Sequence, residues 1–420
     1  MKHDSSEGLR NRLMEKGVVI HCPQSVYIGE DVDPERIDAG VVIHGGSRIA
    51  GKRTLLCRGA QIGRETPATV EDCLAGPDVS LKGGCFSNAV FLDGASVGSG
   101  AHVREGTIFE EHASAAHTVG VKQTILFPFA TLGSLINFCD CLLAGGTGPK
   151  NHSEVGSAFI HFNFTPQQDK ITPSLLGDVP AGVMLNQPPI FLGGQGGLVG
   201  PARLAFGVVT AAGTICRTDE NRVGRLIFGG PAKSGNIAYN QSFYRNIKQA
   251  VNKNAHYIAN LIALKRWYAE VRGGPFISVR FPAVLHAGLM ENIDAAISER
   301  ISRLMKFAAK LEISAEAYRN AAGSGASETL LAQKRALFEN QGRMEDVFLS
   351  GSQTVFKEDV YLRKRFLDAV ERAVDLHGKN DYVGIIQNLA PGDADSGTAW
   401  MRSVVDGVME TWTSAFPDFA

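Results

Sequence analysis

Glycine-rich segments are the first places in this sequence where residue types and spacing could serve chemistry. The segment LLAGGTGPK, from Leu142 to Lys150, could bind a phosphate group, because backbone N–H groups in a glycine-rich turn can form an anion-binding nest. The segment GGQGG, from Gly193 to Gly197, allows two interpretations: tight corners where only glycine tolerates the dihedrals, or close approach of a cofactor to the backbone. No H-E-x-x-H, P-loop or G-x-S-x-G motif is present, so proteases, NTPases and hydrolases of those types are not supported.

Cysteine content and charge restrict the possible partners. The 7 cysteines are scattered along the chain, which is typical of reduced thiols. Cys139-Asp140-Cys141 lacks the C-x-x-C spacing of common zinc sites, so we interpret it as structural and predict no metal. Lys plus Arg number 42 and Asp plus Glu 43, so no overall field favours nucleic acid. The sequence shows no signal-peptide core and no bilayer-length apolar run, so we expect a cytoplasmic protein without nucleic-acid or membrane partners.

The middle of the chain contains a repeat six residues long, and the structure formed by this repeat must hold any functional side chains there in place. Phe91, Val97, Val103 and Phe109 recur every six residues, and a small residue follows four positions after each. This period matches neither the amphipathic helix nor the half-buried strand. It is typical of a hexapeptide β-solenoid, in which three short strands form each coil around a triangular cross-section. The large residue of each hexad then points into the prism.

The repeat recurs between residues 23 and 230. It starts near Ile28, lapses between about Thr66 and Cys85, where we expect a loop or an irregular coil, and returns from Leu198 to Asp219. Residues 145–192 contain several prolines, and loops that leave a rigid prism are where a binding site is usually built. We therefore predict an N-terminal cap over residues 1–22 and a β-solenoid over residues 23–230.

Residues 231–420 follow a helical period. Ile293, Ile297, Ile301 and Leu304, for example, recur at the spacing of an amphipathic helix. This pattern predicts an α-helical C-terminal domain after the solenoid. Because a solenoid leaves exposed ends and faces, the helices could cap it, pack along a face or assemble subunits, and the sequence leaves the three roles open.

Four segments resemble motifs of one transferase family. They are, with the family motif in parentheses, Leu198–Asp219 (L-V-A-P…A-A-G-T), Val103–Gly106 (R-P-G), Val121–Gln123 (V-K-N/K) and Gly156–Phe164 (G-A-G-T-I-x-x-N-Y). The family is the left-handed β-helix acyltransferases, in particular the acetyltransferase domain of the bifunctional N-acetylglucosamine-1-phosphate uridyltransferase / glucosamine-1-phosphate acetyltransferase. The resemblance covers about residues 90 to 220. It implies a left-handed coil and a homotrimer with sites between adjacent prisms.

The resemblance also assigns binding residues. It implies that Arg104 and Lys122 contact the phosphates and sugar of the substrate, and that Asn163 helps to hold the amino sugar or the acetyl donor. Lys170 corresponds to a further lysine of the family, with the loop out of register by one residue. The segment implied to line the acetyl-CoA groove is made of small residues: Ala211, Ala212, Gly213 and Thr214.

The general base of the family is missing from its expected place. In the family's G-S-K-x-x-H segment the histidine takes the proton of the attacking amine, and this sequence has Phe138 there. A phenyl ring cannot accept a proton. Either transfer by that mechanism is lost or another histidine has taken over, and the candidate bases are His152, His161 and His117.

Three functions follow for testing. The first is an acyltransferase that acts on a nucleotide sugar, such as UDP-N-acetylglucosamine, or on an amino-sugar phosphate, with acetyl-CoA or another acyl-CoA as co-substrate and a nonstandard base. The alternative is a noncatalytic sugar-nucleotide-binding or assembly scaffold. The third is a sugar nucleotidyltransferase, because Leu142–Lys150 is similar to the L-x-A-G-G-x-G-T-R loop of those enzymes. The third function lacks the alternating βα pattern in which that loop normally lies.

Overall fold

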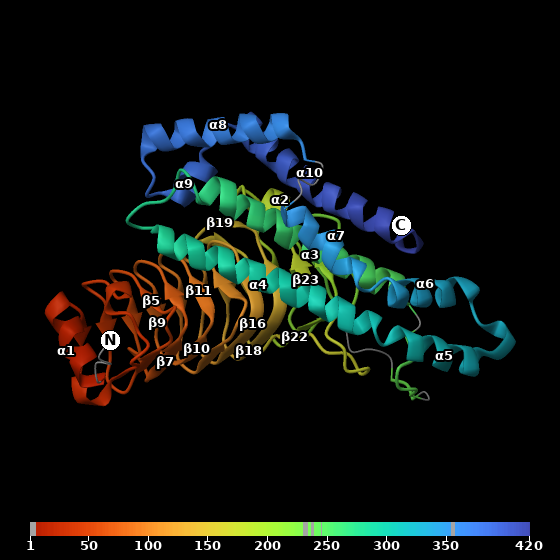
Figure 1. Cartoon of the computed structure of the whole chain (residues 1–420), viewed down its shortest axis with the longest axis horizontal. Coiled ribbons are helices and arrows are strands. Elements are labelled where there is room, and N and C mark those ends of the chain that lie inside the picture. Colours follow the sequence, from red (N-terminus) through yellow and green to blue (C-terminus); the bar gives the residue numbers. More distant parts are fainter. Residues whose placement is uncertain (1–5, 230–233, 237–238, 245, 354–357) are drawn as a thin grey trace.

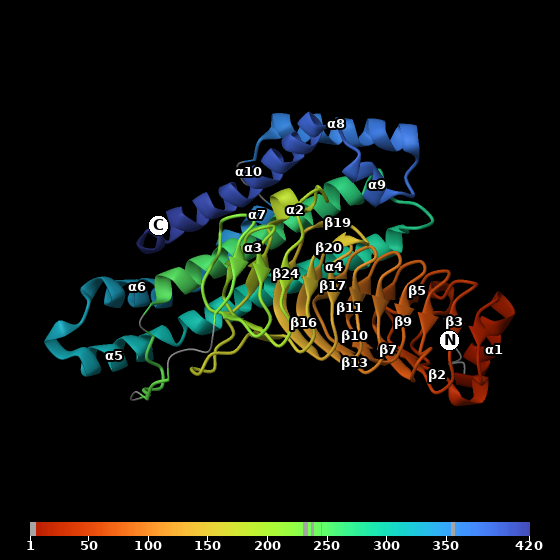
Figure 2. The same ribbon diagram turned by 180° about the vertical axis from the view of Figure 1, so that it is seen from behind.

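The protein consists of a three-sided parallel β-solenoid, called the prism below, and a layer of helices along one of its sides (Figure 1, Figure 2). The computed structural model describes residues 6–229, 234–236, 239–244, 246–353 and 358–420. The predicted fold class, a β-solenoid followed by a helical domain, is confirmed. The predicted boundary at residue 230 lies outside the described residues, between the last prism strand, β29 (Leu226–Ile227), and the first helix of the layer, α3 (Ile247–Trp267).

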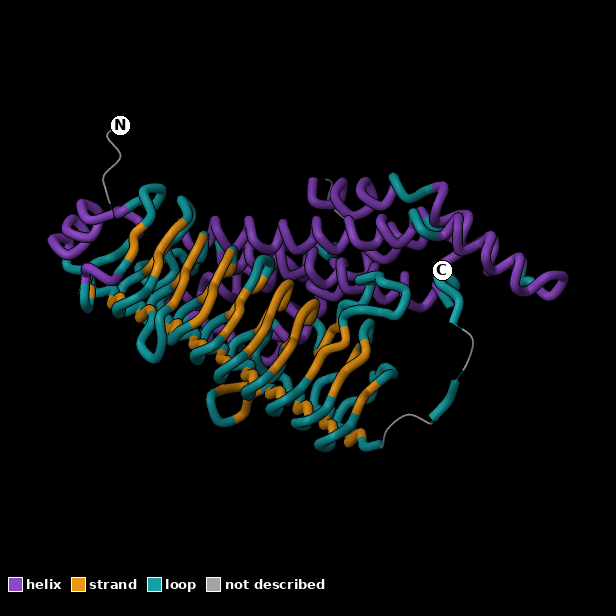
Figure 3. Tube along the Cα trace, turned by 90° about the horizontal axis from the view of Figure 1, so that it is seen from below, coloured by secondary structure: helices purple, strands orange, loops and turns teal. Residues whose placement is uncertain are grey.

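The three sides of the prism, named faces A, B and C, are built from strands that pair in parallel with the next coil (Figure 3). Face A contains β1 (Val19–Ile20), β3 (Val42–Ile43), β6 (Gln61–Ile62), β9 (Ser80–Leu81), β12 (Ser96–Val97), β15 (Ser114–Ala115), β17 (Thr131–Leu132), β21 (Glu154–Val155), β24 (Phe191–Leu192), β27 (Val209–Thr210) and β29 (Leu226–Ile227). Face B contains β2 (Tyr27–Ile28), β4 (Arg48–Ala50), β7 (Ala68–Glu71), β10 (Gly84–Ser87), β13 (Ala101–Val103), β22 (Ile160–Phe162), β25 (Gly197–Val199) and β28 (Ile215–Cys216). Face C contains β5 (Leu55–Leu56), β8 (Leu74–Ala75), β11 (Ala89–Phe91), β14 (Thr107–Phe109), β23 (Ser174–Leu176) and β26 (Arg203–Leu204).

Two long strands cross the edge between faces B and C. They are β16 (Val119–Leu126) and β18 (Ile136–Leu143), which pair with each other along most of their length. Each turns the edge at one residue with a positive φ, Gln123 (51°) and Asp140 (61°) respectively. A single left-handed residue shortens the step between inward side chains, so that Phe138 and Leu143 are five residues apart instead of six.

The same shortening explains why the sequence pattern lapses between Thr66 and Cys85. We expected a loop or an irregular coil there, and the chain forms an irregular coil, because β7, β8, β9 and β10 continue all three faces at unequal spacing. The buried residues Ile62, Val70, Ala75 and Leu81 follow one another at steps of eight, five and six. Coils with such unequal steps hide the hexapeptide period without interrupting the solenoid.

Face C differs from the other faces because its strands are apolar on both sides. One row of its side chains points into the prism, and the alternate row is buried as well. This second row, called the apolar stripe below, runs from coil to coil along Leu55, Leu74, Val90, Ile108, Ile125, Leu142 and Leu175. Strands buried on both faces read as continuous apolar pairs, such as Ile108-Phe109, instead of alternating with polar residues.

The helical layer covers the apolar stripe. Its longest helix, α4 (Ala283–Ala308), contacts β8, β11 and β14, and a side chain at Gly288 would collide with Leu74. The remaining helices of the layer are α3 (Ile247–Trp267), α5 (Leu311–Ala322), α6 (Glu328–Glu339), α7 (Arg343–Gln353), α8 (Val360–His377), α9 (Tyr382–Gln387) and α10 (Pro391–Ala415). Of the three roles left open by the sequence, the helices therefore pack along a face.

Ionic contacts fix the helical layer at both edges of face C. At the edge with face B, Arg300 of α4 pairs with Asp140 at 2.9 Å. At the edge with face A, Arg272 pairs with Glu111, and Tyr268 donates to Glu110 at 2.5 Å. All these side chains are buried, so the layer is held by charges that lie out of water as well as by the apolar stripe.

Shorter elements complete the fold. The N-terminal helix α1 (Ser6–Lys16) packs against β1 and β2 at the first coil. A short antiparallel hairpin of β19 (Gly146–Gly148) and β20 (Asn151–His152), and a one-turn helix, α2 (Val179–Gly182), leave the prism between coils. Within the described ranges, none of the helices combines the length and apolar character needed to cross a bilayer.

Candidate functional site

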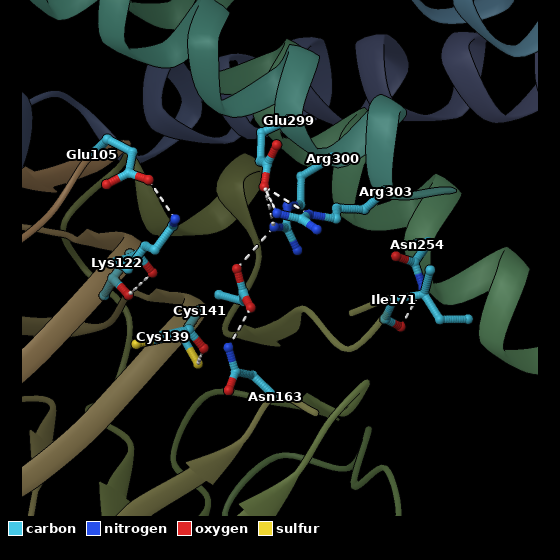
Figure 4. Close-up of polar contacts among 12 residues, drawn as sticks. Glu105, Lys122, Cys139, Cys141, Asn163, Ile171, Asn254, Glu299, Arg300 and Arg303 are labelled. Carbon is cyan, nitrogen blue, oxygen red and sulfur yellow. Dashed lines mark hydrogen bonds and ion pairs between the residues drawn. The ribbon is translucent and has the colours of Figure 1, made fainter. Parts of the chain in front are cut away.

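Arg104 and Lys122 lie next to each other at the edge between faces B and C. The backbone N–H of Arg104, just after β13, bonds to Val121, which precedes Lys122 on β16. Cys139 continues the same row, because the pairing of β16 with β18 places it opposite Lys122 (Figure 4). The two cations assigned to the substrate by the resemblance therefore belong to one row, on consecutive coils.

Each side chain in this row has a polar neighbour. Lys122 forms an ion pair with Glu105, and Arg104 Nη2 lies 3.5 Å from Cys139 Sγ. Burial alone raises the pKa of Glu105, but the hydrogen bond and charge of Lys122 outweigh it and the net pKa is lowered. Burial raises the pKa of the Cys139 thiol, and the guanidinium of Arg104 opposes this only in part. Arg104 Nε is buried without a partner among the described residues, so the row keeps one unused donor.

Asn163 is held in place from the helical layer. Its Nδ2 donates to Asp140 Oδ2 at 2.6 Å, and Arg300 pairs with the other oxygen of Asp140 (Figure 4). Asp140 and Arg300 are each 3% exposed. Losing one partner of such a pair would leave a buried, unpaired charge, so the arrangement is rigidly specified. The helical layer thus positions a residue that the resemblance assigns to the substrate.

Lys170 lies in the loop between β22 and β23. The loop is tied to α3, because Asn254 Nδ2 donates to the carbonyl of Ile171 at 2.8 Å (Figure 4). Lys170 is half-buried and forms no hydrogen bond or ion pair with another described residue. Its role in substrate binding stays a prediction.

His161 lies inside the prism. Its Nδ1 is 2.6 Å from the carbonyl of Cys139, so this nitrogen must carry the proton, and Nε2 accepts from Ser174 Oγ at 2.8 Å. Burial lowers the pKa of His161 to about 4, against the opposing influence of Asp140. With both nitrogens bonded and the side chain 1% exposed, His161 has no free lone pair to take a proton from a substrate.

Position 138 is also interior. Phe138 is fully buried and packs edge to face against His161 and Phe159. In β18 the outward neighbours are Asn137 and Cys139, so a side chain at position 138 cannot reach a ligand outside the prism. The sequence difference at Phe138 therefore belongs to the core of the prism, together with the buried histidine beside it.

His117 and His152 occupy two other edges. His117 is exposed at the edge between faces A and B, where Nδ1 lies 2.9 Å from Ser134 Oγ and Nε2 has no partner among the described residues. His152 belongs to the β19–β20 hairpin at the edge between faces C and A. Its Nδ1 contacts the carbonyl of Pro149 at 2.9 Å and its Nε2 lies 3.5 Å from Glu154. The three candidate bases do not converge on one point.

The segment from Ala211 to Thr214 lies at the same edge as His117. It follows β27 and turns into face B, with Ala212 and Gly213 exposed and Thr214 buried. The coil below it approaches closely: Gly213 N–H bonds to the carbonyl of Gly194, and a Cβ at Gly193 would lie 2.5 Å from Ala211. This close stacking accounts for the glycines of Gly193–Gly197 in structural terms.

The two other motifs singled out in the sequence form ordinary parts of the prism. In Cys139-Asp140-Cys141 the first thiol points outward and the second is fully buried inside, so the two cannot hold one ion between them. The end of LLAGGTGPK forms the β19–β20 hairpin, which Gln387 of α9 anchors at the carbonyl of Thr147. This hairpin is not the turn from strand to helix in which a nucleotidyltransferase holds phosphates.

The sequence motifs missed the pair formed by Asp140 and Arg300. In the sequence, Asp140 is the residue between Cys139 and Cys141, and Arg300 is a polar position of an amphipathic helix, so neither residue signals the contact. For His161, by contrast, a usable pattern existed. Leu132 and Phe138, and likewise Val155 and His161, are six residues apart, so the hexapeptide period itself places both rings on inward positions.

Comparison with known proteins bears out the resemblance. The bifunctional protein GlmU of Thermotoga petrophila is 29% identical over 208 residues, which cover 49% of this chain and 41% of that protein. GlmU of Streptococcus agalactiae is 29% identical over 191 residues, covering 40% of this chain and 39% of that protein. The chain thus spans less than half the length of these relatives. No protein-family model matches the chain.

A structure of LpxA from Acinetobacter baumannii is 11% identical and covers 66% of this chain and 97% of that one, with a TM-score of 0.20. This TM-score is too low to carry an argument.

Proposed function

We propose that this protein is an acyltransferase-like protein that binds a nucleotide sugar or an amino-sugar phosphate along face B. The observation that carries the proposal is the row of Arg104 and Lys122, which places two cations side by side at the edge of that face. Charge-assisted hydrogen bonds from two adjacent cations suit the oxygens of a phosphate group. A bound phosphate would replace Glu105 as the partner of Lys122. An acyl-CoA donor would lie at the opposite edge, along Ala211 to Thr214.

His117 is the proposed base for transfer. It is exposed, and with Nδ1 occupied by Ser134 its Nε2 can accept a proton. The acceptor amine or hydroxyl would attack the thioester carbonyl, forming the new C–N or C–O bond, and its proton would pass to His117. The C–S bond would then break, and the thiolate of coenzyme A would leave and take up the proton. His152, with Glu154 beside it, is the second candidate and lies at another edge.

A second copy of the chain would complete the groove. Face B carries exposed apolar side chains, among them Ile160 and Phe162. The homotrimer implied by the resemblance would cover these residues and supply the opposite wall of the site. Light scattering of the purified chain should therefore give three times the mass of 45.0 kDa. A monomer would remove the second wall and with it this site.

The alternative is a noncatalytic sugar-nucleotide-binding or assembly scaffold. It is favoured by one observation, the interior position of Phe138, which leaves the family's base without a counterpart at that place. Both functions require the ligand to bind at Arg104 and Lys122, but only the first requires a base.

Ligand binding tests both functions together. Thermal unfolding is followed with UDP-N-acetylglucosamine and, separately, with acetyl-CoA, since a ligand at a hundred times its Kd stabilises by about 2.7 kcal/mol. Lys122→Ala should abolish the effect of the sugar nucleotide. Lys82→Ala, which breaks the comparable surface pair with Glu65 at the edge between faces A and B, should leave it intact. No stabilisation by either ligand would exclude both functions.

Turnover then separates the two functions. Release of free coenzyme A from acetyl-CoA is measured in the presence of glucosamine 1-phosphate or UDP-N-acetylglucosamine. The transferase predicts turnover that His117→Gln lowers about 100-fold or more and His152→Gln leaves unchanged. Binding without turnover would establish the scaffold.

A further inference from the structure

The apolar stripe on face C ends at a charged residue. In the ladder of face C, Leu175 pairs with Arg203, so the arginine takes the outward position that aliphatic side chains occupy on the preceding coils. Its guanidinium makes no hydrogen bond or ion pair with any described residue. Burial lowers the pKa of Arg203, and the charges of Asp219 and Asp178 compensate for this only in part. The guanidinium of Arg203 is therefore partly buried and has no partner among the described residues.

A cavity opens in front of this arginine. It has a volume of about 330 Å³ and lies between the last coils of the prism, the N-terminal part of α2 and the middle of α10. A second guanidinium, that of Arg402 on α10, lines the same cavity from the helical layer and also lacks a hydrogen bond or ion pair in the described chain. The volume is at the lower end of the range found for small-molecule sites.

The carboxylates around the cavity are already engaged. Asp178 caps α2 by accepting the N–H of Ala181 at 2.9 Å, and Asp219 pairs with Lys253 at 2.8 Å. Glu220 forms a two-point contact with the guanidinium of Arg222. The hydrogen bond from Ala181 leaves the charge of Asp178 in place, so the lining of the cavity carries two guanidinium groups against this one carboxylate.

We propose that this cavity binds a small molecule through a phosphate group held between Arg203 and Arg402. A phosphate monoester carries close to two negative charges and matches the planar donor sets of two guanidinium groups. One arginine comes from the prism and the other from the helical layer, so the ligand would join the two parts. The site lies on face C and is independent of the proposed acyl transfer on face B.

Inorganic phosphate is the probe that tests this site. Calorimetric titration of the full chain at constant ionic strength should give saturable binding, and Arg402→Ala should weaken it at least 10-fold. Arg402 is exposed, so this change does not disturb the core. Arg203→Gln should weaken binding at least as much, after its melting curve has shown that it folds. Arg372→Ala removes another exposed arginine, from α8, and should change the affinity less than twofold.

The proposal is overturned by any of three results. These are the absence of saturable phosphate binding, binding by Arg402→Ala that equals the wild type, and binding of succinate as tight as that of phosphate. Phosphate binding lost in Arg402→Ala and kept in Lys122→Ala would establish the site and separate it from the substrate edge on face B.

Discussion

Faces B and C of the prism are built from the same repeat but serve different neighbours. On face C the outward row is Leu74, Val90, Ile108 and their equivalents, all buried under helices. On face B the corresponding outward row passes through His102, Gly120, Asn137, Ile160, Gly197 and Ile215. Several of these residues are exposed or small, and no such continuous apolar stripe forms.

This comparison shows that the inward row of side chains specifies the solenoid, whereas the outward row specifies what covers each face. Hexapeptide coils require only that the inward side chains fill the prism. Each residue of the apolar stripe contributes on the order of 2 kcal/mol to the stability of the fold when helices remove it from water. Face C therefore has to be covered by the helical layer. Face B remains free for a ligand or a second copy of the chain. Four changes test this distinction, in order of decreasing effect.

The largest effect is expected from a charge placed in the apolar stripe. Ile108→Asp would bury a carboxylate between β14 and α4 and should lower the free energy of unfolding by about 5 kcal/mol or prevent folding. The matched change on face B, His102→Asp, concerns an exposed residue of the outward row and should cost about 0.5 kcal/mol or less. Urea unfolding measures both, and equal costs would refute the distinction between the faces.

The second effect concerns the ionic cluster at the edge between faces C and A. Arg272→Met leaves Glu110 and Glu111 buried without their cation and should cost about 4 kcal/mol. Arg280→Met removes a cation from Asp93 and Asp78 at a partly exposed site and should cost about 1 kcal/mol or less. If the two variants unfold at the same urea concentration, the apolar stripe alone holds the helices.

The third effect links the helical layer to face B. Arg300→Met leaves Asp140 unpaired and should cost about 3 kcal/mol. Because Asp140 also holds Asn163, the effect of Asn163→Ala should differ by at least 0.5 kcal/mol or so between the wild-type and Arg300→Met backgrounds. The control is Arg303→Met, one turn further along α4, where Glu299 is the partner. If the stability effects of Arg300→Met and Asn163→Ala add strictly in the double variant, the helical layer and face B are not coupled.

The smallest effect is a change in the pH dependence of stability. Burial, with a smaller contribution from Glu111, raises the pKa of Glu110 to about 7, although Arg272 and Tyr268 oppose this. The folded chain therefore binds this proton more tightly than the unfolded chain. The stabilisation is complete below the ordinary pKa of about 4.5 and is lost as the pH rises through about 7.

Glu110→Gln should remove this dependence. Between pH 5 and pH 8 the wild type should lose stability relative to the variant, by on the order of 2 kcal/mol. Urea unfolding at a series of pH values measures the two curves. Parallel curves for the wild type and Glu110→Gln would assign the titration to another group.

The hexapeptide period was sufficient to predict the prism, because filling a triangular interior imposes the period directly on the sequence. It failed where Asp72, Asn88, Gln123 and Asp140 turn an edge in a single left-handed residue, since each such turn shifts the phase by one. The amphipathic pattern predicted helices but not their place. Such a pattern shows that one side of a helix is buried, but it does not show what covers that side. The surface of the prism that covers it is marked in the strands, by apolar pairs such as Ile125-Leu126.

The candidate site was predictable only where the repeat itself carries the residues. Arg104 and Lys122 come from consecutive coils, so their positions in the repeat place them together. Arg300 and Asp140 are 160 positions apart in the sequence, so no local sequence pattern predicts their contact. The inward phase of His161 can be counted from Val155, and this count alone distinguishes the buried histidine from the exposed His117.

The apolar stripe also has a consequence for synthesis on the ribosome. The prism strands up to β29 are translated before α3 and α4, which cover the stripe. During that interval a row of aliphatic side chains on an already coiled segment faces water with nothing over it. Nascent chains released before α4 should therefore aggregate or remain bound to chaperones. Ribosome-associated intermediates of this protein should become protease-resistant only after α4 has emerged from the exit tunnel.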